Sequence, residues 1–325
     1  MRCHAIRIHE TGGPEKLRWE EVEVGEPGPG EVLLRHTAVG LNYIDTYHRG
    51  GLYPVSLPSG LGLEAAGVVE KLGAGVSGLK IGDRVAYCSG PIGAYSECRL
   101  YPADRVVKLP DGIDDRTAAA MMLQGLTVEY LTRRTFSVKP GQTVLLHAAA
   151  GGIGLIACQW LKHIGATVIG TAGGPEKAAI ATAHGCDHVI DYRKEDVAKR
   201  VRELTDGKGV PVVYDGVGKD TFQASLDSLA RRGMFVSFGN ASGPVPAFEP
   251  GVLAAKGSLY LTRPTLAAYV GTRQELVAAA DALFDVVLKG AVKIRVNQTY
   301  SLKDAAQAQR DLEGRKTTGS TVLLP

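Results

Sequence analysis

From about Gln142 onward, short apolar runs alternate with segments whose apolar residues recur at helical spacing. Such alternation predicts a parallel β-sheet covered by helices on both faces. The number of apolar runs matches the six strands of a doubly wound dinucleotide-binding fold. The runs are 143–147, 167–171, 188–191, 211–215, 234–238 and 258–262, and the helical segments are about 155–164, 175–184, 195–205 and 220–230.

The first third of the chain has a different pattern, in which Gly, Pro and Asp frequently interrupt the apolar runs. This pattern predicts a region rich in strands and turns. After Pro264 we expect a helix at about 273–289, a short strand at 293–296, a helix at about 302–312 and a last strand at Thr321–Leu324. Because this tail is too small to bury a core of its own, we expect it to return to the first domain.

The segment Thr143–Gly174 has the strand–turn–helix–strand order of a dinucleotide-binding unit. Gly151 and Gly152 leave the turn open to a pyrophosphate, which the N-terminus of the following helix attracts. Gly154 allows the helix to pack closely on the strand, whereas Ala149 replaces the first glycine of the usual fingerprint, a change that a looser turn could accommodate. The alternative is a glycine-rich turn with a purely structural role.

Length and composition narrow the function classes. A chain of 325 residues favours two domains, and a net charge of +3 argues against nucleic acid as a primary partner. No apolar run reaches the ~18 residues of a membrane span, and Met1-Arg2-Cys3-His4 does not begin a signal peptide. The five scattered cysteines are typical of reduced thiols in a cytoplasmic enzyme.

Several motifs together identify a family. The chain resembles the zinc-independent, zeta-crystallin-like NADPH:quinone oxidoreductases of the medium-chain dehydrogenase/reductase superfamily, most closely the bacterial enzymes, and it does so from end to end. The motifs are Gly40-Leu41-Asn42-Tyr43-Ile44-Asp45-Thr46-Tyr47, Arg49-Gly50-Gly51-Leu52-Tyr53-Pro54, Ala148-Ala149-Ala150-Gly151-Gly152-Ile153-Gly154, Val236-Ser237-Phe238-Gly239-Asn240 and Thr262-Arg263-Pro264.

The resemblance implies an α/β fold, with a GroES-like β-barrel catalytic domain at 1–125 and 265–325 and a doubly wound Rossmann domain at 126–264. It also implies an NADPH cofactor in an interdomain cleft and a homodimer. The implied cofactor-binding residues are Asn42, Gln124, Thr127, Tyr130, Gly151, Gly152, Ile153, Gly154, Gly173, Gly174, Lys177, Tyr192, Val217, Phe238, Gly239, Asn240, Pro264 and Arg315.

The superfamily's alcohol dehydrogenases hold a catalytic zinc with Cys, His and Cys. At the matching positions this chain has Asn42, Gly62-Leu63-Glu64 and Gln124-Gly125. Because both thiolates and the imidazole are absent, no tetrahedral site of that type can form. We therefore expect hydride transfer without a metal.

Quinones suit such a site because they are strong electrophiles that need little polarisation. The candidate catalytic residues are Asn42, Asp45, Tyr47 and Tyr53, since tyrosine offers a flat apolar face and a hydroxyl. Alternatively, Asn42 and Asp45 cap a helix that starts near Tyr43, and the tyrosines only pack. None of the eight histidines is our candidate general acid, because His147 and His163 have no partner nearby in sequence.

The expected cofactor preference is NADPH over NADH. NAD-binding folds place an acid about 20 residues after the glycine turn, and no acid occurs between Leu155 and Pro175. Gly173 and Gly174 leave room for a 2′-phosphate and offer it backbone N–H groups, while Lys177, Tyr192 and, by the resemblance, Arg315 would bind it. In the alternative interpretation, the two cations are solvated surface charges.

The leading interpretation is an NADPH-dependent quinone reductase. Reduction of α,β-unsaturated carbonyls and a crystallin-like binding or structural role remain open alternatives. The strand 258–262 reads Leu-Tyr-Leu without a charge at a predicted sheet edge, so we expect the homodimer to form there.

Overall fold

The computed structural model describes all of residues 1–325, and the chain divides into two compact units. Unit 1 comprises Met1–Leu126, Val270–Leu288 and Ile294–Pro325. Unit 2 comprises Thr127–Tyr269 and Lys289–Lys293. Unit 1 is therefore assembled from three separate segments of the chain.

Unit 2 is built on a six-stranded sheet with the order β11-β10-β9-β12-β13-β14. All neighbouring strands are parallel. Counted from β9, this is the strand order of the doubly wound dinucleotide fold, so that prediction is confirmed. The strands are β9 (Thr143–Leu146), β10 (Thr167–Ala172), β11 (His188–Asp191), β12 (Val210–Asp215), β13 (Leu229–Ser237) and β14 (Tyr260–Thr262).

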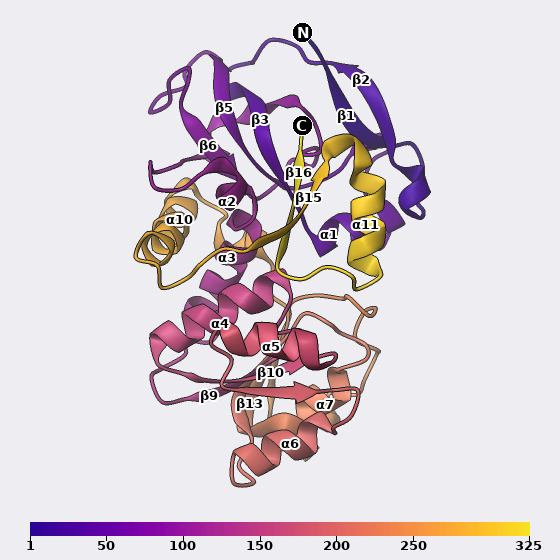
Figure 1. Cartoon of the computed structure of the whole chain (residues 1–325), viewed down its shortest axis with the longest axis vertical. Helices are drawn as coiled ribbons and strands as arrows, with labels where there is room; N and C mark the ends of the chain where they lie inside the picture. The colour runs from indigo at the N-terminus through magenta and orange to yellow at the C-terminus, as the bar shows by residue number, and fades with distance from the viewer. The chain divides into compact units, whose positions relative to one another are not determined.

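Helices pack against this sheet because its central strands are apolar on both faces. Figure 1 shows α4, α5, α6 and α7 around β9, β10 and β13. Leu145, Ile169, Val213 and Phe235 are fully buried in the resulting core. The helices of unit 2 are α4 (Gly152–Ile164), α5 (Pro175–Ala183), α6 (Val197–Leu204), α7 (Phe222–Ser228), α8 (Gly251–Ala255) and α9 (Leu266–Tyr269), together with the π-helical segment η3 (Tyr130–Thr135).

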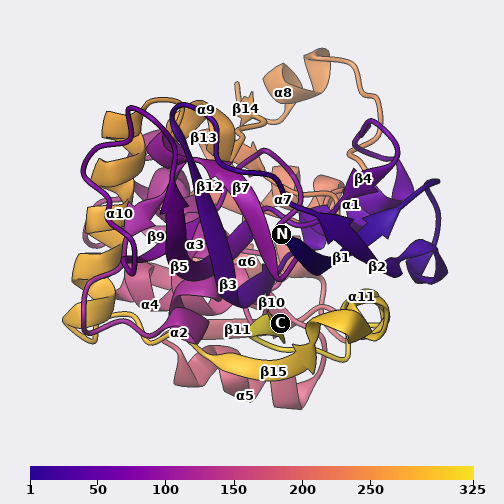
Figure 2. The ribbon, with the colours of Figure 1, turned by 90° about the horizontal axis from the view of Figure 1, so that it is seen from above.

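Unit 1 contains two sheets, one of three strands in the order β2-β1-β4 and one of seven strands. The order in the larger sheet is β15-β16-β3-β5-β6-β8, and β7 also pairs with β3. Figure 2 shows β3, β5 and β7 side by side. The strands are β1 (Arg2–Ile8), β2 (Arg18–Glu23), β3 (Glu31–Leu41), β4 (Ser59–Gly60), β5 (Glu64–Leu72), β6 (Arg84–Tyr87), β7 (Cys98–Pro102), β8 (Val107–Lys108), β15 (Val296–Ser301) and β16 (Ser320–Leu324).

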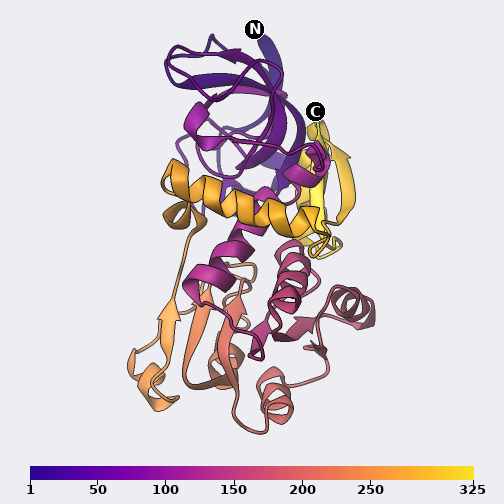
Figure 3. The same cartoon turned by 90° about the vertical axis from the view of Figure 1, so that its left-hand side faces the viewer.

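Short helices connect these strands, and one long helix, α10 (Arg273–Leu288), belongs to the second segment of unit 1 (Figure 3). The core of the unit joins residues from its first and last segments, since Ile8, Tyr95, Leu302 and Leu323 belong to one buried cluster. The remaining helices are α1 (Tyr43–Gly50), α2 (Asp115–Ala119), α3 (Met122–Glu129), which contains the boundary with unit 2, and α11 (Ala305–Glu313), with the 3₁₀ turns η1 (Pro14–Lys16), η2 (Ala103–Arg105) and η4 (Leu302–Asp304).

Two further observations concern the whole chain. All five cysteines are buried and free. None of the helices is both long enough and apolar enough to span a bilayer.

Candidate functional site

In unit 1, Asn42 stands at the N-cap of α1, and the backbone N–H of Asn42 donates to Asp45 Oδ2 at 2.9 Å. The same oxygen accepts from the Tyr95 hydroxyl at 2.8 Å. Asp45 is fully buried, and its Oδ1 has no hydrogen-bond partner. Asp45 therefore caps the start of α1, as the alternative interpretation expected. Its second carboxyl oxygen, Oδ1, makes no hydrogen bond.

The three positions that match the zinc ligands of the alcohol dehydrogenases come together as a polar network. Asn42 Nδ2 donates to Glu64 Oε2 at 2.6 Å, and Gln124 Nε2 donates to Asn42 Oδ1 at 3.2 Å. Glu64 Oε1 accepts from the Leu123 N–H at 2.8 Å, and Gln124 Oε1 accepts from the Ser320 hydroxyl at 2.8 Å. The structure contains no group of three or more His, Cys, Asp or Glu side chains that could hold a metal ion.

Burial makes the two carboxyl groups of this network weak acids. Desolvation raises the pKa of Glu64 to about 8, although the hydrogen bonds from Asn42 and Leu123 lower it. Desolvation likewise raises the pKa of Asp45 to about 7, against the hydrogen bonds from Asn42 and Tyr95. Burial therefore favours the protonated form of both carboxyl groups more than is usual for Asp and Glu.

The predicted tyrosines form an aromatic cluster next to this network. Tyr47 is mostly buried on α1, and its ring centroid lies 5.6 Å from that of Tyr43 and 5.2 Å from that of Tyr53. The Tyr53 N–H donates to the Tyr47 carbonyl at 3.2 Å, which fixes the turn after the helix. The His48 ring completes the cluster at 5.8 Å from Tyr53. The structure thus brings Tyr47 and Tyr53 together with their rings nearly perpendicular.

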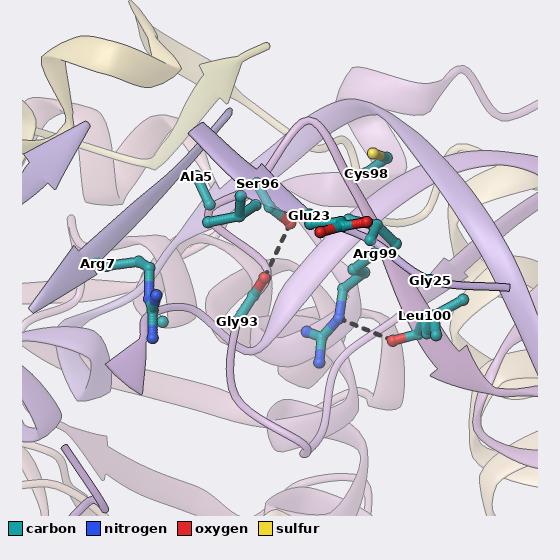
Figure 4. A pocket seen from close by; sticks show the side chains of 12 residues that line it. Ala5, Arg7, Glu23, Gly25, Gly93, Ser96, Cys98, Arg99 and Leu100 are labelled. Atoms are coloured by element: carbon teal, nitrogen blue, oxygen red, sulfur yellow. Dashed lines mark hydrogen bonds between the residues drawn. The ribbon is translucent and has the colours of Figure 1, made fainter. Parts of the chain in front are cut away.

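A hollow of about 320 Å³ on unit 1 is lined by none of the predicted site residues (Figure 4). Backbone carbonyls hold its polar side chains, since Arg99 Nε donates to Leu100 O at 3.3 Å and Ser96 Oγ donates to Gly93 O at 3.0 Å. We assign no role in the reaction to this hollow.

In unit 2, the glycine turn leads into α4 with Gly151 at the N-cap. The first N–H groups of a helix have no intrahelical partner, so those at the start of α4 are available to an anion. A Cβ at Gly154 would lie 2.4 Å from Ala148 O and 2.6 Å from Ala149 O. Gly154, which lies in α4, therefore lets the helix approach closely the backbone that follows β9.

The unusual backbone conformation in this turn belongs to Ala148, with a φ of 56°, and not to Ala149. A left-handed conformation costs a residue with a Cβ roughly 1–2 kcal/mol. Two hydrogen bonds hold the turn in this shape: the Ala148 N–H donates to Thr171 Oγ1 at 3.2 Å, and the Gly151 N–H donates to Ala148 O at 3.0 Å. The strained residue of this turn is therefore Ala148, next to the position where Ala149 replaces the first glycine.

Beneath the turn lies a fully buried relay of side chains that sequence reasoning missed. His147 Nδ1 lies 3.2 Å from Thr171 Oγ1, and His147 Nε2 lies 3.0 Å from Ser225 Oγ. Ser225 donates its single hydroxyl proton to Asp215 Oδ2 at 2.7 Å. His147 Nε2 must therefore carry a hydrogen, and Nδ1 must accept from Thr171. Burial lowers the pKa of His147, which agrees with this neutral imidazole.

Asp215 ends β12 and organises the next turn. Its Oδ1 accepts from the N–H groups of Val217 at 2.8 Å and Gly218 at 3.0 Å, and its Oδ2 also accepts from the Thr221 hydroxyl at 2.7 Å. The carboxylate and His147 together connect the ends of β9, β10 and β12. Carboxyl ends of parallel strands are where doubly wound folds bind ligands.

The end of β10 brings together some of the residues predicted for the 2′-phosphate. The Tyr192 hydroxyl lies over Gly173, where it would be 2.5 Å from an added Cβ. Lys177 occupies the first turn of α5. The Gly174 N–H, however, donates to Asp191 Oδ1 at 3.1 Å. The expectation that both glycines offer free N–H groups is therefore wrong for Gly174.

The other predicted cofactor residues fall into both units. Val217, Phe238, Gly239, Asn240 and Pro264 follow the ends of β12, β13 and β14 in unit 2. Gly239 packs so closely on Gly216 that a Cβ would lie 2.4 Å from Gly216 O. Thr127 and Tyr130 belong to unit 2, with Tyr130 stacked on Tyr269 at 4.5 Å, whereas Asn42, Gln124 and Arg315 belong to unit 1.

Comparison with known proteins shows similarity over the whole chain. Residues 28–111 match the family described as the alcohol dehydrogenase GroES-like domain, and residues 152–285 match the family described as zinc-binding dehydrogenase. The chain is 56% identical over 321 residues to a quinone oxidoreductase of Pseudomonas aeruginosa, covering 98% of this chain and 99% of the relative.

Two further similarities bear on chemistry. The crystal structure of Escherichia coli quinone oxidoreductase in complex with NADPH has a TM-score of 0.98 and 50% identity, covering 99% of this chain and 100% of that one. A 2-haloacrylate reductase of Burkholderia is 49% identical over 330 residues, covering 99% of this chain and 98% of the relative. These matches confirm the predicted pairing of a GroES-like domain with a Rossmann domain.

Proposed function

Because the chain belongs to the quinone oxidoreductase family of the medium-chain dehydrogenase/reductase superfamily, we propose that it reduces quinones with NADPH. The observation that carries this proposal is similarity to quinone oxidoreductases along almost the full chain, at 56% identity over 98% of its length for the Pseudomonas aeruginosa relative. Such a reaction needs a site for the cofactor and a site for the quinone. The glycine turn of unit 2 would provide the first, and the aromatic cluster of unit 1 would provide the second.

The residues of unit 2 fit the cofactor. Gly154 lets the backbone fold tightly before α4, and the free N–H groups at the start of α4 would hold the pyrophosphate. Lys177, Tyr192 and Arg315 would hold the 2′-phosphate, and the segment from Leu155 to Pro175, which contains β10, has no acid of its own. Bound NADPH supplies the hydride, so the protein only positions the two reactants and excludes water. The other proposed cofactor contacts are Asn42, Gln124, Thr127, Tyr130, Ile153, Gly173, Val217, Phe238, Gly239, Asn240 and Pro264.

The residues of unit 1 fit a planar, electrophilic substrate. Tyr47 and Tyr53 would receive the ring, and Asn42 is held in one orientation by Glu64 and Gln124. Asn42 uses one of its two amide hydrogens on Glu64, so the second remains to donate to a substrate or cofactor oxygen. Asp45 would contribute indirectly, because its carboxyl group accepts from the Asn42 backbone N–H and so fixes the start of α1. We propose that the reaction needs no metal, because the three matching positions bond to one another.

A second candidate function is reduction of an activated carbon–carbon double bond. The observation that favours it is 49% identity to a 2-haloacrylate reductase over 99% of this chain. A carboxylate-bearing substrate of this kind would need a cation in the substrate pocket, and Asn42, Tyr47 and Tyr53 have no cationic side chain. The geometry therefore favours the quinone.

An assay of NADPH oxidation distinguishes the candidates. The purified protein is offered ortho- and para-quinones, alkenals and 2-chloroacrylate, with and without a strong chelator. We expect the highest kcat/KM with a quinone and no change with the chelator. A higher kcat/KM for 2-chloroacrylate would support the second function, whereas NADPH binding without any turnover would support a binding role. Activity that is lost on chelation and restored by zinc would contradict metal independence.

Tyr53→Ala is expected to lower kcat/KM for a planar bicyclic quinone several-fold to about tenfold while leaving the NADPH dissociation constant unchanged. Loss of an aromatic contact costs on the order of 0.5–1.5 kcal/mol beyond the buried area. Steady-state kinetics and calorimetry provide the measurements. Tyr53→Phe is the matched control, since it keeps the ring and should retain most activity. Wild-type kinetics in Tyr53→Ala would mean that this ring only packs against Tyr47.

We also propose a homodimer, in the cytoplasm, through β14. This strand pairs only with β13, and Tyr260 and Leu261 on it are 58% and 36% exposed. A second copy would satisfy the open edge by twofold pairing. Leu261→Lys is expected to shift the mass in analytical ultracentrifugation at micromolar concentration from dimer to monomer. Ile81→Lys, at a 65% exposed position of unit 1, is the control. A monomeric wild type would contradict the proposal.

A further inference from the structure

An arginine that follows β11 stands against the glycine turn at the end of β10. A Cβ at Gly173 would lie 3.3 Å from Arg193 Nε, and a Cβ at Gly174 would lie 3.6 Å from Arg193 Nη1. The guanidinium therefore covers the two residues that leave room for a phosphate. The hydroxyl of the neighbouring Tyr192 also lies against Gly173, so both side chains pack on the same glycine turn.

The backbone holds Arg193 at this place. Asp191 Oδ1 accepts both from the Gly174 N–H at 3.1 Å and from the Arg193 N–H at 3.2 Å. One carboxylate oxygen thus ties the end of β10 to the turn after β11. Because this acid is directed at backbone donors, it fixes the position of the arginine and leaves the guanidinium unneutralised.

The Arg193 side chain is exposed and has no ion pair or side-chain hydrogen bond in the structure. The nearby acid Glu195 is engaged elsewhere, with its Oε1 accepting from the Asp191 N–H at 3.1 Å and its Oε2 3.7 Å from Arg200 Nε. A guanidinium presents a planar fork of donors that matches the oxygens of a phosphate. In doubly wound folds, the adenosine ribose lies at the end of the second strand, which is β10 here.

We infer that Arg193 binds the 2′-phosphate of NADPH and is a specificity-determining residue for NADPH over NADH. This inference rests on the proposed use of NADPH and adds a residue that the sequence did not indicate. Lys177 follows the second strand, β10, whereas Arg193 lies in the turn after the third, β11, beside Tyr192.

The test is calorimetric binding of two small probes, 2′-AMP and 5′-AMP, to wild type and to Arg193→Ala. We expect Arg193→Ala to weaken 2′-AMP by about tenfold or more, the usual effect of losing a hydrogen bond to a charged group. Binding of 5′-AMP should stay within about twofold. Arg193→Lys should restore part of the affinity, because it keeps the charge without the fork.

Lys194→Ala is the matched control, since it removes one exposed cation from the next position. It should leave the affinity for both probes unchanged. Equal loss of both probes in Arg193→Ala, or no loss of either, would overturn the inference. If wild type bound NADPH no better than NADH, the proposed cofactor itself would fail, which is a separate outcome from an unchanged Arg193→Ala with the wild-type preference intact.

Discussion

Asp215→Ala is expected to lower the free energy of unfolding of unit 2 by about 3–5 kcal/mol and to weaken NADPH binding. The carboxylate accepts four hydrogen bonds, from two backbone N–H groups and from the hydroxyls of Thr221 and Ser225. Alanine would leave these donors buried without a partner. The Ser225 hydroxyl would lose its acceptor, which weakens the chain of hydrogen bonds from Ser225 through His147 to Thr171. Thr171 accepts from the Ala148 N–H, so the strained turn would lose part of its support.

Urea unfolding and calorimetry with NADPH measure the two effects. Asp220→Ala, which removes an exposed carboxylate from the same loop, is the control and should change neither quantity. Ser225→Ala gives a milder test, because it removes the two hydrogen bonds of the Ser225 hydroxyl, with His147 and with Asp215, and leaves the backbone contacts of Asp215 in place. A loss of less than about 1 kcal/mol in Asp215→Ala would contradict the assigned role.

Glu64→Gln is expected to remove a large part of the dependence of stability on pH. The folded state holds the pKa of Glu64 at about 8, against an ordinary value of 4.5. Between these values the folded carboxyl keeps a proton that the unfolded one has lost. The contribution of Glu64 to stability is therefore complete below about pH 4.5 and is lost as the pH rises to 8, by up to about 1.4 kcal/mol per pH unit.

The measurement is urea unfolding of wild type and Glu64→Gln at pH 5, 6.5 and 8. Relative to wild type, the variant should become progressively more stable as the pH rises. Glu23→Gln, at an exposed position of β2, is the control and should run parallel to wild type. If the free energies of unfolding of wild type and Glu64→Gln changed with pH in the same way, the Glu64 carboxyl would be ionised in the folded state. The two hydrogen bonds that it accepts favour that ionised form.

Much of unit 2 could be predicted because its signals are local. Each buried strand is a short apolar run, and each helix shows its own period, so the alternation led directly to the sheet order that the structure shows. The segment 293–296 was different. A short strand was expected there, but Gln159 binds both the N–H and the carbonyl of Lys293, and the strand is Val296–Ser301 instead.

Reasoning from the residues alone predicted the site only where neighbours in sequence are also neighbours in space, whereas the matched positions Asn42, Glu64 and Gln124 came from the family resemblance. The Asn42 cap and the Gly151 turn are of this kind. The relay from Thr171 to Asp215 was not, because His147 reaches partners 24 and 78 residues away. Asp191 and Gly174 are also far apart in sequence, so the hydrogen bond from the Gly174 N–H to Asp191 could not be predicted. One available signal was Asp215 itself, an acid at the end of an apolar run.

The place of β16 in the larger sheet of unit 1 has a consequence for biosynthesis. β16 lies between β15 and β3, and its Thr321–Leu323 pair with Val39–Leu41. A ribosome makes β3 early and β16 after every other strand of the sheet, so β3 waits with an open edge while the whole of unit 2 is translated. Unit 2, drawn almost entirely from one continuous segment, can fold during that interval. Closure of unit 1 is therefore a late event, and a chain released before Ser320 would expose the β3 edge to aggregation.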